Sequence, residues 1–145
     1  MKTWIFDMDG TLANTDHRKH FLEKRPKDWD GWHSLAYLDE PHHDIVGFTD
    51  AAVELGYQVV ICSGRGEEQR DLTEQWLEKH KISYTKLYMR AAADFRDDSV
   101  IKLELLAQMR ADGFDPVLAF DDRDRVVAAW RSAGIRCLQV ADGAF

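Results

Sequence analysis

Ile5-Phe6-Asp7-Met8-Asp9-Gly10-Thr11 is an apolar run that ends in two carboxylates and a turn-forming glycine. Two aspartates separated by one residue can face the same small volume where a strand ends. Two anions that close are stable only with a cation between them or a proton on one of them. Asp-Gly also begins ordinary turns, but the strand before Asp7 and the glycine after Asp9 favour a reactive site. We therefore interpret Asp7 and Asp9 as a pair of functional carboxylates.

Short β-rich runs alternate with longer helical patterns along the rest of the chain. The predicted strands cover residues 3–7, 58–62, 84–89, 117–120 and 136–140. The predicted helices cover residues 44–55, 67–80, 99–112 and 123–133. Alternation of apolar strands with helices predicts a parallel sheet that is covered on both faces. The predicted fold class is therefore α/β, with a Rossmann-like three-layer parallel sheet.

Residues from about 15 to 43 fit neither pattern and separate the first strand from the first long helix. We predict a small helical cap insertion here, within a single domain that covers residues 1–145. Its apolar residues recur at near-helical spacing and are expected to close its own hydrophobic face; they are Trp29, Trp32, Leu35 and Leu38. A cap of this kind would lie over the site and exclude water.

The composition excludes several classes of protein. Hydrophobic residues make up 45% of the chain, which is typical of a globular protein and not of a disordered one. A net charge of −7 argues against a protein that coats long nucleic acid with its whole surface. The apolar runs are far shorter than the ~20 residues that cross a bilayer, and residues 1–7 do not form a signal peptide. Cys62 and Cys137 lie in apolar stretches, which is typical of free thiols in the cytoplasm.

Polar residues follow three of the five predicted strands. Parallel sheets bind ligands beyond the carboxyl ends of their strands, and these ends carry Asp7 to Asp9, Ser63-Gly64-Arg65 and Asp121-Asp122-Arg123. The carboxylates form an all-oxygen set that favours Mg²⁺ over Zn²⁺; they are Asp7, Asp9, Asp121 and Asp122. A Mg²⁺ ion held in this way accepts a phosphate oxygen, so the set indicates phosphoryl transfer.

The same strand ends supply groups that suit a phosphate. Arg65 and Lys102 provide the positive charge that balances a transferring phosphoryl group. Ser63 adds a hydroxyl donor, and Gly64 allows the backbone to approach the phosphate closely. Asp98 precedes Lys102 by one helical turn and is expected to orient it, since residues at i and i+4 share a helix face.

The order Asp7-Met8-Asp9-Gly10-Thr11, Ser63, Lys102 and Asp121-Asp122 resembles the four motifs of the haloacid dehalogenase-like (HAD) phosphatase superfamily. The resemblance implies that Asp7 attacks phosphorus and forms an aspartyl-phosphate, while Asp9 protonates the leaving group and then activates water. It also implies that Mg²⁺ is bound by Asp7, by the backbone carbonyl of Asp9 and by Asp122, with Asp121 beside it. Thr11 would join Ser63, Gly64, Arg65 and Lys102 among the residues that bind substrate.

A narrower resemblance links the chain to the 3′-phosphatase domains of phage polynucleotide kinase-phosphatases. It rests on Ser63-Gly64-Arg65, on the stretch from Arg96 to Lys102, on Asp121-Asp122-Arg123 and on the final Gln139-Val140-Ala141. The resemblance implies catalytic roles for Arg18, Arg65 and Asp98. No G-x-x-x-x-G-K-[ST] sequence occurs, so we expect no kinase domain and no ATP site.

These motifs predict a Mg²⁺-dependent phosphomonoesterase that removes 3′-phosphates from DNA or RNA ends or from nucleotides. A small-molecule (deoxy)ribonucleotidase shares the same motifs, and a non-catalytic binding module of the same fold is a further alternative. The basic, aromatic stretch from Arg18 to Trp32 fits either a single-strand binding surface or an amphipathic cap helix. The sequence leaves the choice between these two interpretations open.

Overall fold

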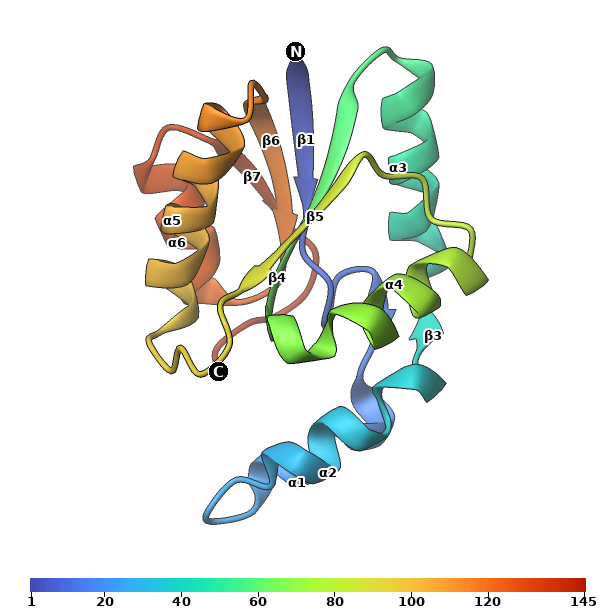
Figure 1. Cartoon of the computed structure of the whole chain (residues 1–145), viewed down its shortest axis with the longest axis vertical. Coiled ribbons are helices and arrows are strands. Elements are labelled where there is room, and N and C mark those ends of the chain that lie inside the picture. Colours follow the sequence, from blue (N-terminus) through green and yellow to red (C-terminus); the bar gives the residue numbers. More distant parts are fainter.

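The computed structural model describes all residues from Met1 to Phe145 and contains a five-stranded parallel sheet (Figure 1). The strand order is β5-β4-β1-β6-β7. The strands are β1 (Lys2–Phe6), β4 (Gln58–Gly66), β5 (Lys86–Arg90), β6 (Asp115–Asp121) and β7 (Arg136–Gln139). The first strand therefore lies at the centre of the sheet, and Asp7 and Asp9 follow this central strand.

Helices cover both faces of this sheet, which confirms the predicted three-layer α/β fold (Figure 1). Helices α5 (Asp98–Ala111) and α6 (Asp124–Ser132) lie on one face, and α3 (His43–Glu54) and α4 (Arg70–Lys79) lie on the other. Consecutive residues of β1 pack into different layers: Ile5 joins the cluster beneath α5 and α6, whereas Phe6 joins the cluster beneath α3 and α4. Strands that are apolar throughout are required for this arrangement.

The predicted boundaries agree with the structure to within about three residues for every long element except one. Strand β4 was expected to end at Cys62, but it continues to Gly66. Its register with β5 shifts between Ser63 and Gly66, and the Arg65 amide donates a hydrogen bond to Ser63 Oγ (3.1 Å). Side chain to backbone bonding of this kind lets an irregular strand persist where a loop was expected.

The segment between β1 and α3 forms a small helical insert, defined here as residues 15–42. Strand β2 (Ala13–Asn14) pairs antiparallel with β3 (Glu40–Pro41) to form its stem. Between these strands lie the short helices α1 (His20–Glu23) and α2 (Trp29–Ser34) and the 3₁₀ turns Asp16–Arg18 and Ala36–Leu38. Figure 1 shows the insert projecting from the edge of the sheet at which β1, β4 and β6 end.

The insert closes its hydrophobic face only in part. Trp32 is buried with 8% of its surface exposed, but Trp29 and Leu38 remain 51% and 52% exposed. The expectation of a closed face is therefore wrong for Trp29 and Leu38. Helix α2 ends at Ser34. Leu38 therefore does not share a continuous helix with Trp29 and Trp32, and the spacing of these residues does not place them on one helical face. No helix of the chain is both long and apolar enough to span a membrane.

Candidate active site

Asp7 lies at the end of β1 among charged groups that are almost completely buried. Its Oδ1 accepts a hydrogen bond from Lys102 Nζ (2.6 Å), and its Oδ2 accepts one from Thr11 Oγ (3.0 Å). Lys102 Nζ also donates to Asp121 Oδ2 (2.8 Å). The α5 helix therefore delivers its lysine to the strand end, as the sequence predicted, and one ammonium group bridges two carboxylates.

Three buried carboxylates converge beside this lysine. Oxygen atoms of Asp7, Asp121 and Asp122 lie within 4.8 Å of one another. Burial raises the pKa of Asp7 well above its ordinary value, and repulsion from Asp121 and Asp122 adds to that effect, whereas Lys102 acts in the opposite direction. A divalent cation would relieve this repulsion, and all-oxygen donors suit a hard ion such as Mg²⁺. The donor set therefore fits the predicted kind of metal.

The two aspartates at the end of β6, Asp121 as its last residue and Asp122 after it, have different surroundings. Asp121 accepts from Lys102 and from Trp130 Nε1 (3.1 Å) on one oxygen and from the Asp122 amide (2.9 Å) on the other. The Asp122 carboxylate accepts no such bond, although it is also buried. The Asp122 carboxylate packs against the backbone of Gly10. A Cβ added at Gly10 would lie 2.1 Å from Asp122 Oδ2, and the φ of Gly10 is +83°. Only glycine suits that position, and Asp122 keeps free lone pairs for a ligand.

Asp9 faces away from the carboxylate cluster and toward two arginines. Its Oδ1 accepts from Arg18 (2.7 Å) and from Arg65 (2.6 Å), and its Oδ2 accepts a second bond from Arg65 (3.1 Å). Burial acts to raise the pKa of Asp9, but Arg65 and Arg18 outweigh it and lower the pKa far below its ordinary value. The Asp9 side chain is therefore not part of the carboxylate cluster, and only its backbone carbonyl remains a candidate metal ligand.

Arg18 is held by a residue that the sequence analysis missed. Asp39, near the end of the insert, accepts two bonds from the Arg18 guanidinium (2.8 and 2.6 Å) and is only 2% exposed. His17 Nε2 also contacts Asp39 (2.6 Å), and Trp76 Nε1 donates to the Asp39 carbonyl (2.9 Å). The only sequence signal was an acidic residue beside the apolar Leu38, which is too common to select Asp39.

The groups expected to bind phosphate lie at the same edge of the sheet. Ser63 is buried at the end of the regular part of β4, and Gly64 follows it. The Gly64 carbonyl accepts a bond from Arg90 Nε (2.8 Å). A Cβ at Gly64 would approach Asp98 Oδ1 to 2.8 Å, so the absence of a side chain allows this close packing. The Arg65 guanidinium, in contrast, donates its hydrogen bonds to Asp9 and to Thr73 Oγ (3.0 Å).

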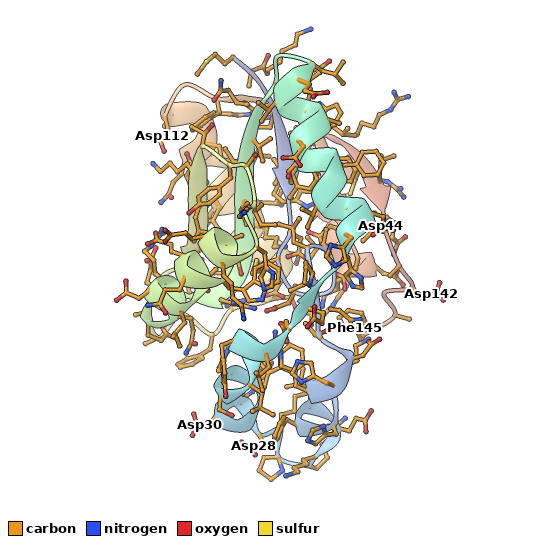
Figure 2. The ribbon with its side chains drawn as sticks, turned by 90° about the vertical axis from the view of Figure 1, so that its right-hand side faces the viewer. Asp28, Asp30, Asp44, Asp112, Asp142 and Phe145 are labelled. Atoms are coloured by element: carbon orange, nitrogen blue, oxygen red, sulfur yellow. The ribbon has the colours of Figure 1, made fainter.

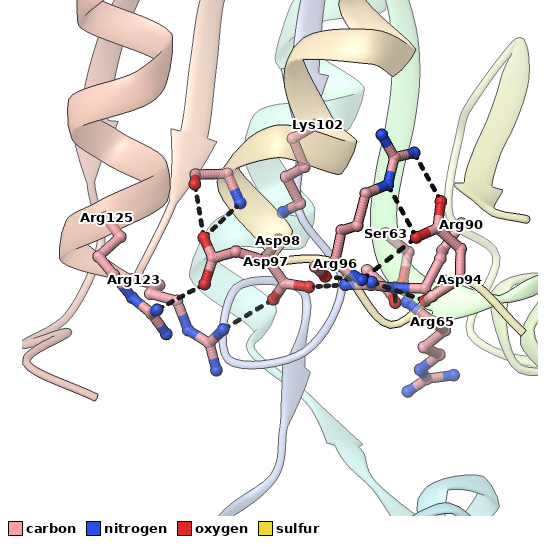
Figure 3. A network of polar contacts seen from close by, with 12 residues as sticks. Ser63, Arg65, Arg90, Asp94, Arg96, Asp97, Asp98, Lys102, Arg123 and Arg125 are labelled. Carbon is pink, nitrogen blue, oxygen red and sulfur yellow. Dashed lines mark hydrogen bonds and ion pairs between the residues drawn. The ribbon is translucent and has the colours of Figure 1, made fainter.

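Asp98 does not contact Lys102, although the two residues are one helical turn apart. Its carboxylate pairs with Arg90 and with Arg123 (2.8 Å) instead, as Figure 3 shows. The expected orientation of Lys102 by Asp98 is therefore wrong. Lys102 already has two carboxylate partners in the core of the site, whereas Asp98 at the first position of α5 lies beside Arg90 at the end of β5 and Arg123 before α6.

Fold and site together define a HAD-like hydrolase, in which acidic residues follow the central strand and its neighbour. The chain belongs to the family of the polynucleotide kinase PNKP phosphatase domain, whose model matches residues 1–145. It is therefore a phosphatase domain of the HAD type.

Individual relatives support this assignment. A chain in the structure of the Pnkp1/Rnl/Hen1 complex is 32% identical with a TM-score of 0.86, and the match covers 99% of this chain and 47% of that one. A protein of Autographa californica nuclear polyhedrosis virus, provisionally named a bifunctional polynucleotide kinase/RNA ligase, is 28% identical over 90% of this chain and 18% of its own length. This chain thus spans about half of the first relative and under a fifth of the second.

More distant structures share the fold alone. The class C acid phosphatase from Bacillus anthracis with tungstate bound is 16% identical with a TM-score of 0.71, over 99% of this chain and 68% of that one.

Proposed function

We propose that this chain is a Mg²⁺-dependent phosphomonoesterase that removes 3′-phosphates from DNA or RNA ends or from nucleotides through an aspartyl-phosphate on Asp7. The observation that carries the proposal is the opposite surroundings of Asp7 and Asp9. Asp7 lies among carboxylates and one lysine, whereas Asp9 lies between two arginines. This contrast supports a scheme in which Asp7 receives a metal and a phosphoryl group, while the Asp9 side chain stays outside that cluster.

Asp7, Asp122 and the backbone carbonyl of Asp9 would hold the metal, with Asp121 beside them. When bound, Mg²⁺ supplies positive charge that neutralises these carboxylates and polarises the phosphate oxygens. Asp121 has a positioning role in this scheme, because its bonds to Lys102 and Trp130 hold the lysine next to Asp7.

The reaction would proceed in two displacements at phosphorus. A carboxylate oxygen of Asp7 forms a bond to phosphorus while the bond to the substrate oxygen breaks, and Asp9 gives its proton to that oxygen. Asp9 then takes a proton from water as the water oxygen attacks the aspartyl-phosphate, which releases inorganic phosphate and restores Asp7. Lys102 balances negative charge during both steps, and Ser63, Thr11 and the backbone at Gly64 would bind the phosphate oxygens.

Asp9 can act as an acid only if it carries a proton, and its arginine partners oppose protonation in the free protein. Arg65, which is 6% exposed, is the candidate cation for an incoming phosphate, whereas Arg18 is fully buried and bonded to Asp9, Asp39 and the Trp32 carbonyl. A phosphate that accepts a bond from Arg65 would weaken the hold of Arg65 on Asp9 and raise the pKa of Asp9. Substrate binding would thereby prepare the acid.

The 3′-phosphate substrate is supported by the family and by the polynucleotide functions in the names of the relatives. The insert projects at the same edge of the sheet, which supports a role as a cap over the substrate within one domain. Two buried free cysteines fit a reducing compartment such as the cytoplasm.

A substrate panel tests this proposal. Wild-type protein with Mg²⁺ should release phosphate from 3′-phosphorylated oligonucleotides faster than from the matching 5′-phosphorylated ones, and chelation should abolish release until Mg²⁺ is restored. The Asp7→Asn variant is the control for contaminating phosphatases. Preference for mononucleotides over oligonucleotides would favour the nucleotidase alternative, and activity confined to 5′-phosphates would refute the 3′ assignment.

A further inference from the structure

Helix α2 carries an aromatic surface that the rest of the chain leaves uncovered. The Trp29 side chain is 51% exposed. Its ring stacks against His33, one turn further along the helix, at 6.3 Å between centroids and 27° between planes. Lys27 Nζ lies 5.6 Å from the centroid of the Trp29 ring. Two flat rings and a cation therefore share one side of the insert.

This aromatic surface is anchored directly to the acid–base side of the site. Arg18, which binds Asp9, also donates to the Trp32 carbonyl (3.2 Å) and lies 4.0 Å from the centroid of the Trp32 ring. His33 is the next residue. Burial lowers the pKa of His33, and the charges of Asp9, Arg65 and Arg18 all act on its imidazole. His33 is therefore next to the residue that contacts the Asp9-bound Arg18, and Trp29 lies one turn nearer the start of α2.

The charge around this surface suits a polyanion better than the rest of the chain does. Between residues 19 and 27 the insert exposes four basic residues and one acidic residue: Lys19, Lys24, Arg25, Lys27 and Glu23. Lys19 pairs with Asp16 (3.0 Å) and Lys24 with Asp28 (3.9 Å), so Arg25 and Lys27 are the two without a carboxylate partner. Asp28 is occupied as the cap of α2, where it accepts from the Gly31 amide (2.9 Å). Asp30 follows Trp29 by one residue and so lies about 100° around the helix from it. Figure 2 shows Asp28 and Asp30 at the end of the insert farthest from the sheet.

We propose that Trp29 and His33 form a stacking surface for the last bases of a single-stranded nucleic acid whose 3′-phosphate lies at Asp7. The inference rests on the proposed function and deepens it by assigning a substrate-binding role to the insert. Exposed aromatic rings stack on any base, and neighbouring cations follow the phosphodiester backbone. Bases within a duplex already stack on each other, so the surface selects unpaired ends.

Substitution of the outer ring tests the surface. Base–aromatic stacking contributes about 1–3 kcal/mol per base, so we expect Trp29→Ala to raise KM for a 3′-phosphorylated oligothymidylate by roughly 5- to 150-fold. Trp29→Phe should recover most of the affinity, because a flat ring is retained. The matched control is Phe95→Ala, which removes a 93% exposed aromatic ring from the loop between β5 and α5; it should keep the wild-type KM.

The substrate provides a second control. A 3′-phosphorylated strand without bases at its last two positions has the same backbone charge but nothing to stack. Wild type should lose affinity for this strand, and Trp29→Ala should then show no further loss. An unchanged KM in Trp29→Ala, an equal loss on both strands, or a loss in Phe95→Ala instead would overturn the inference.

The proposed function and the stacking surface fail in different ways. If wild type does not hydrolyse any 3′-phosphorylated strand, the proposed function is refuted by that result alone. Binding is then measured by fluorescence anisotropy of the same labelled strands with Asp7→Asn protein, with and without Trp29→Ala. Equal dissociation constants for these two proteins would refute the stacking surface, and weaker binding after loss of Trp29 would support it.

Discussion

The two sides of the site are built from different parts of the molecule. The surroundings of Asp7 come from the sheet and the helix packed on it, since Asp121 ends β6, Asp122 follows it, and Lys102 lies on α5. The surroundings of Asp9 depend on the insert, which supplies Arg18 and Asp39, and on Arg65 at the irregular end of β4. The Asp7 side is therefore fixed by the core of the fold, whereas the Asp9 side depends on how the insert is held. Changes on the two sides should have different consequences.

The largest expected effect is the loss of the nucleophile. Asp7→Asn should lower turnover by at least about 1,000-fold, since a carboxamide is a far poorer nucleophile than a carboxylate. The fold should persist, because the amide has nearly the same shape and Lys102 keeps its contact with Asp121. Phosphate release and circular dichroism measure the two properties. Turnover close to that of wild type would show that Asp7 is not the nucleophile.

On the insert side, Asp39→Asn should lower kcat by about 10- to 100-fold, because hydrogen bonds to charged groups contribute about 1.5–3 kcal/mol. Without the Asp39 charge, Arg18 interacts more strongly with Asp9 and lowers its pKa further. The alkaline limb of the kcat profile should therefore move to lower pH, which a purely structural role would not cause.

Asp16→Asn is the control for this experiment, since it removes an exposed carboxylate of the same insert that pairs only with Lys19. It should match wild type. A full pH profile of kcat is the measurement, and a lower kcat without movement of the limb would contradict the assigned role of Asp39.

A smaller effect is expected from substitution of Asp98, which belongs neither to the Asp7 side nor to the Asp9 side of the site. Asp98→Asn should lower kcat/KM by about tenfold, at the low end of the range for charged hydrogen bonds. Arg90 would lose its carboxylate partner, keep its bonds to the carbonyls of Asp94 and Arg96, and hold the Gly64 carbonyl less firmly, so the loss should fall mainly on KM. Glu104→Gln is the control, because Glu104 pairs with Arg96 in the same region but is exposed. A loss confined to kcat would indicate contact with the reacting atoms.

The smallest expected effect is on the free energy of unfolding of the metal-free protein, and it arises from the charge of Asp7. Its pKa is raised in the folded protein, so the folded state binds the proton more tightly than the unfolded state, whose value is near 3.8. Stability from this group is therefore greatest below the unfolded pKa and is lost as pH rises toward the folded pKa. Asn carries no charge at any pH and avoids that loss.

Metal-free Asp7→Asn should accordingly be more stable than metal-free wild type at pH 7, by on the order of 1 kcal/mol. Denaturation in urea with a chelator measures this difference. Added Mg²⁺ should stabilise wild type more than the variant, because the ion binds the carboxylate cluster of the folded state. A variant that is less stable than wild type without metal would contradict the assigned repulsion around Asp7.

The contrast between the two sides also explains how well the sequence predicted each. Asp7, Lys102 and the Asp121-Asp122 pair lie at strand ends or on a helix whose periodicity is clear, so their convergence follows from the topology of a parallel sheet. Asp98 shows the limit of that reasoning. It shares a helix face with Lys102, but its partners are arginines at the end of β5 and at the start of α6, Arg90 and Arg123.

The sequence by itself determined the layered α/β fold, the placement of the paired aspartates at a strand end and the family, because apolar periodicity and short motifs are local signals. Only the tertiary structure decided that Asp9 faces two arginines, that Asp39 holds Arg18, and that Trp29 stays exposed. These contacts depend on the path of an irregular insert, and 21 residues separate Arg18 from Asp39. Such a path has no repeating pattern, so its side-chain partners become visible only when the chain is folded.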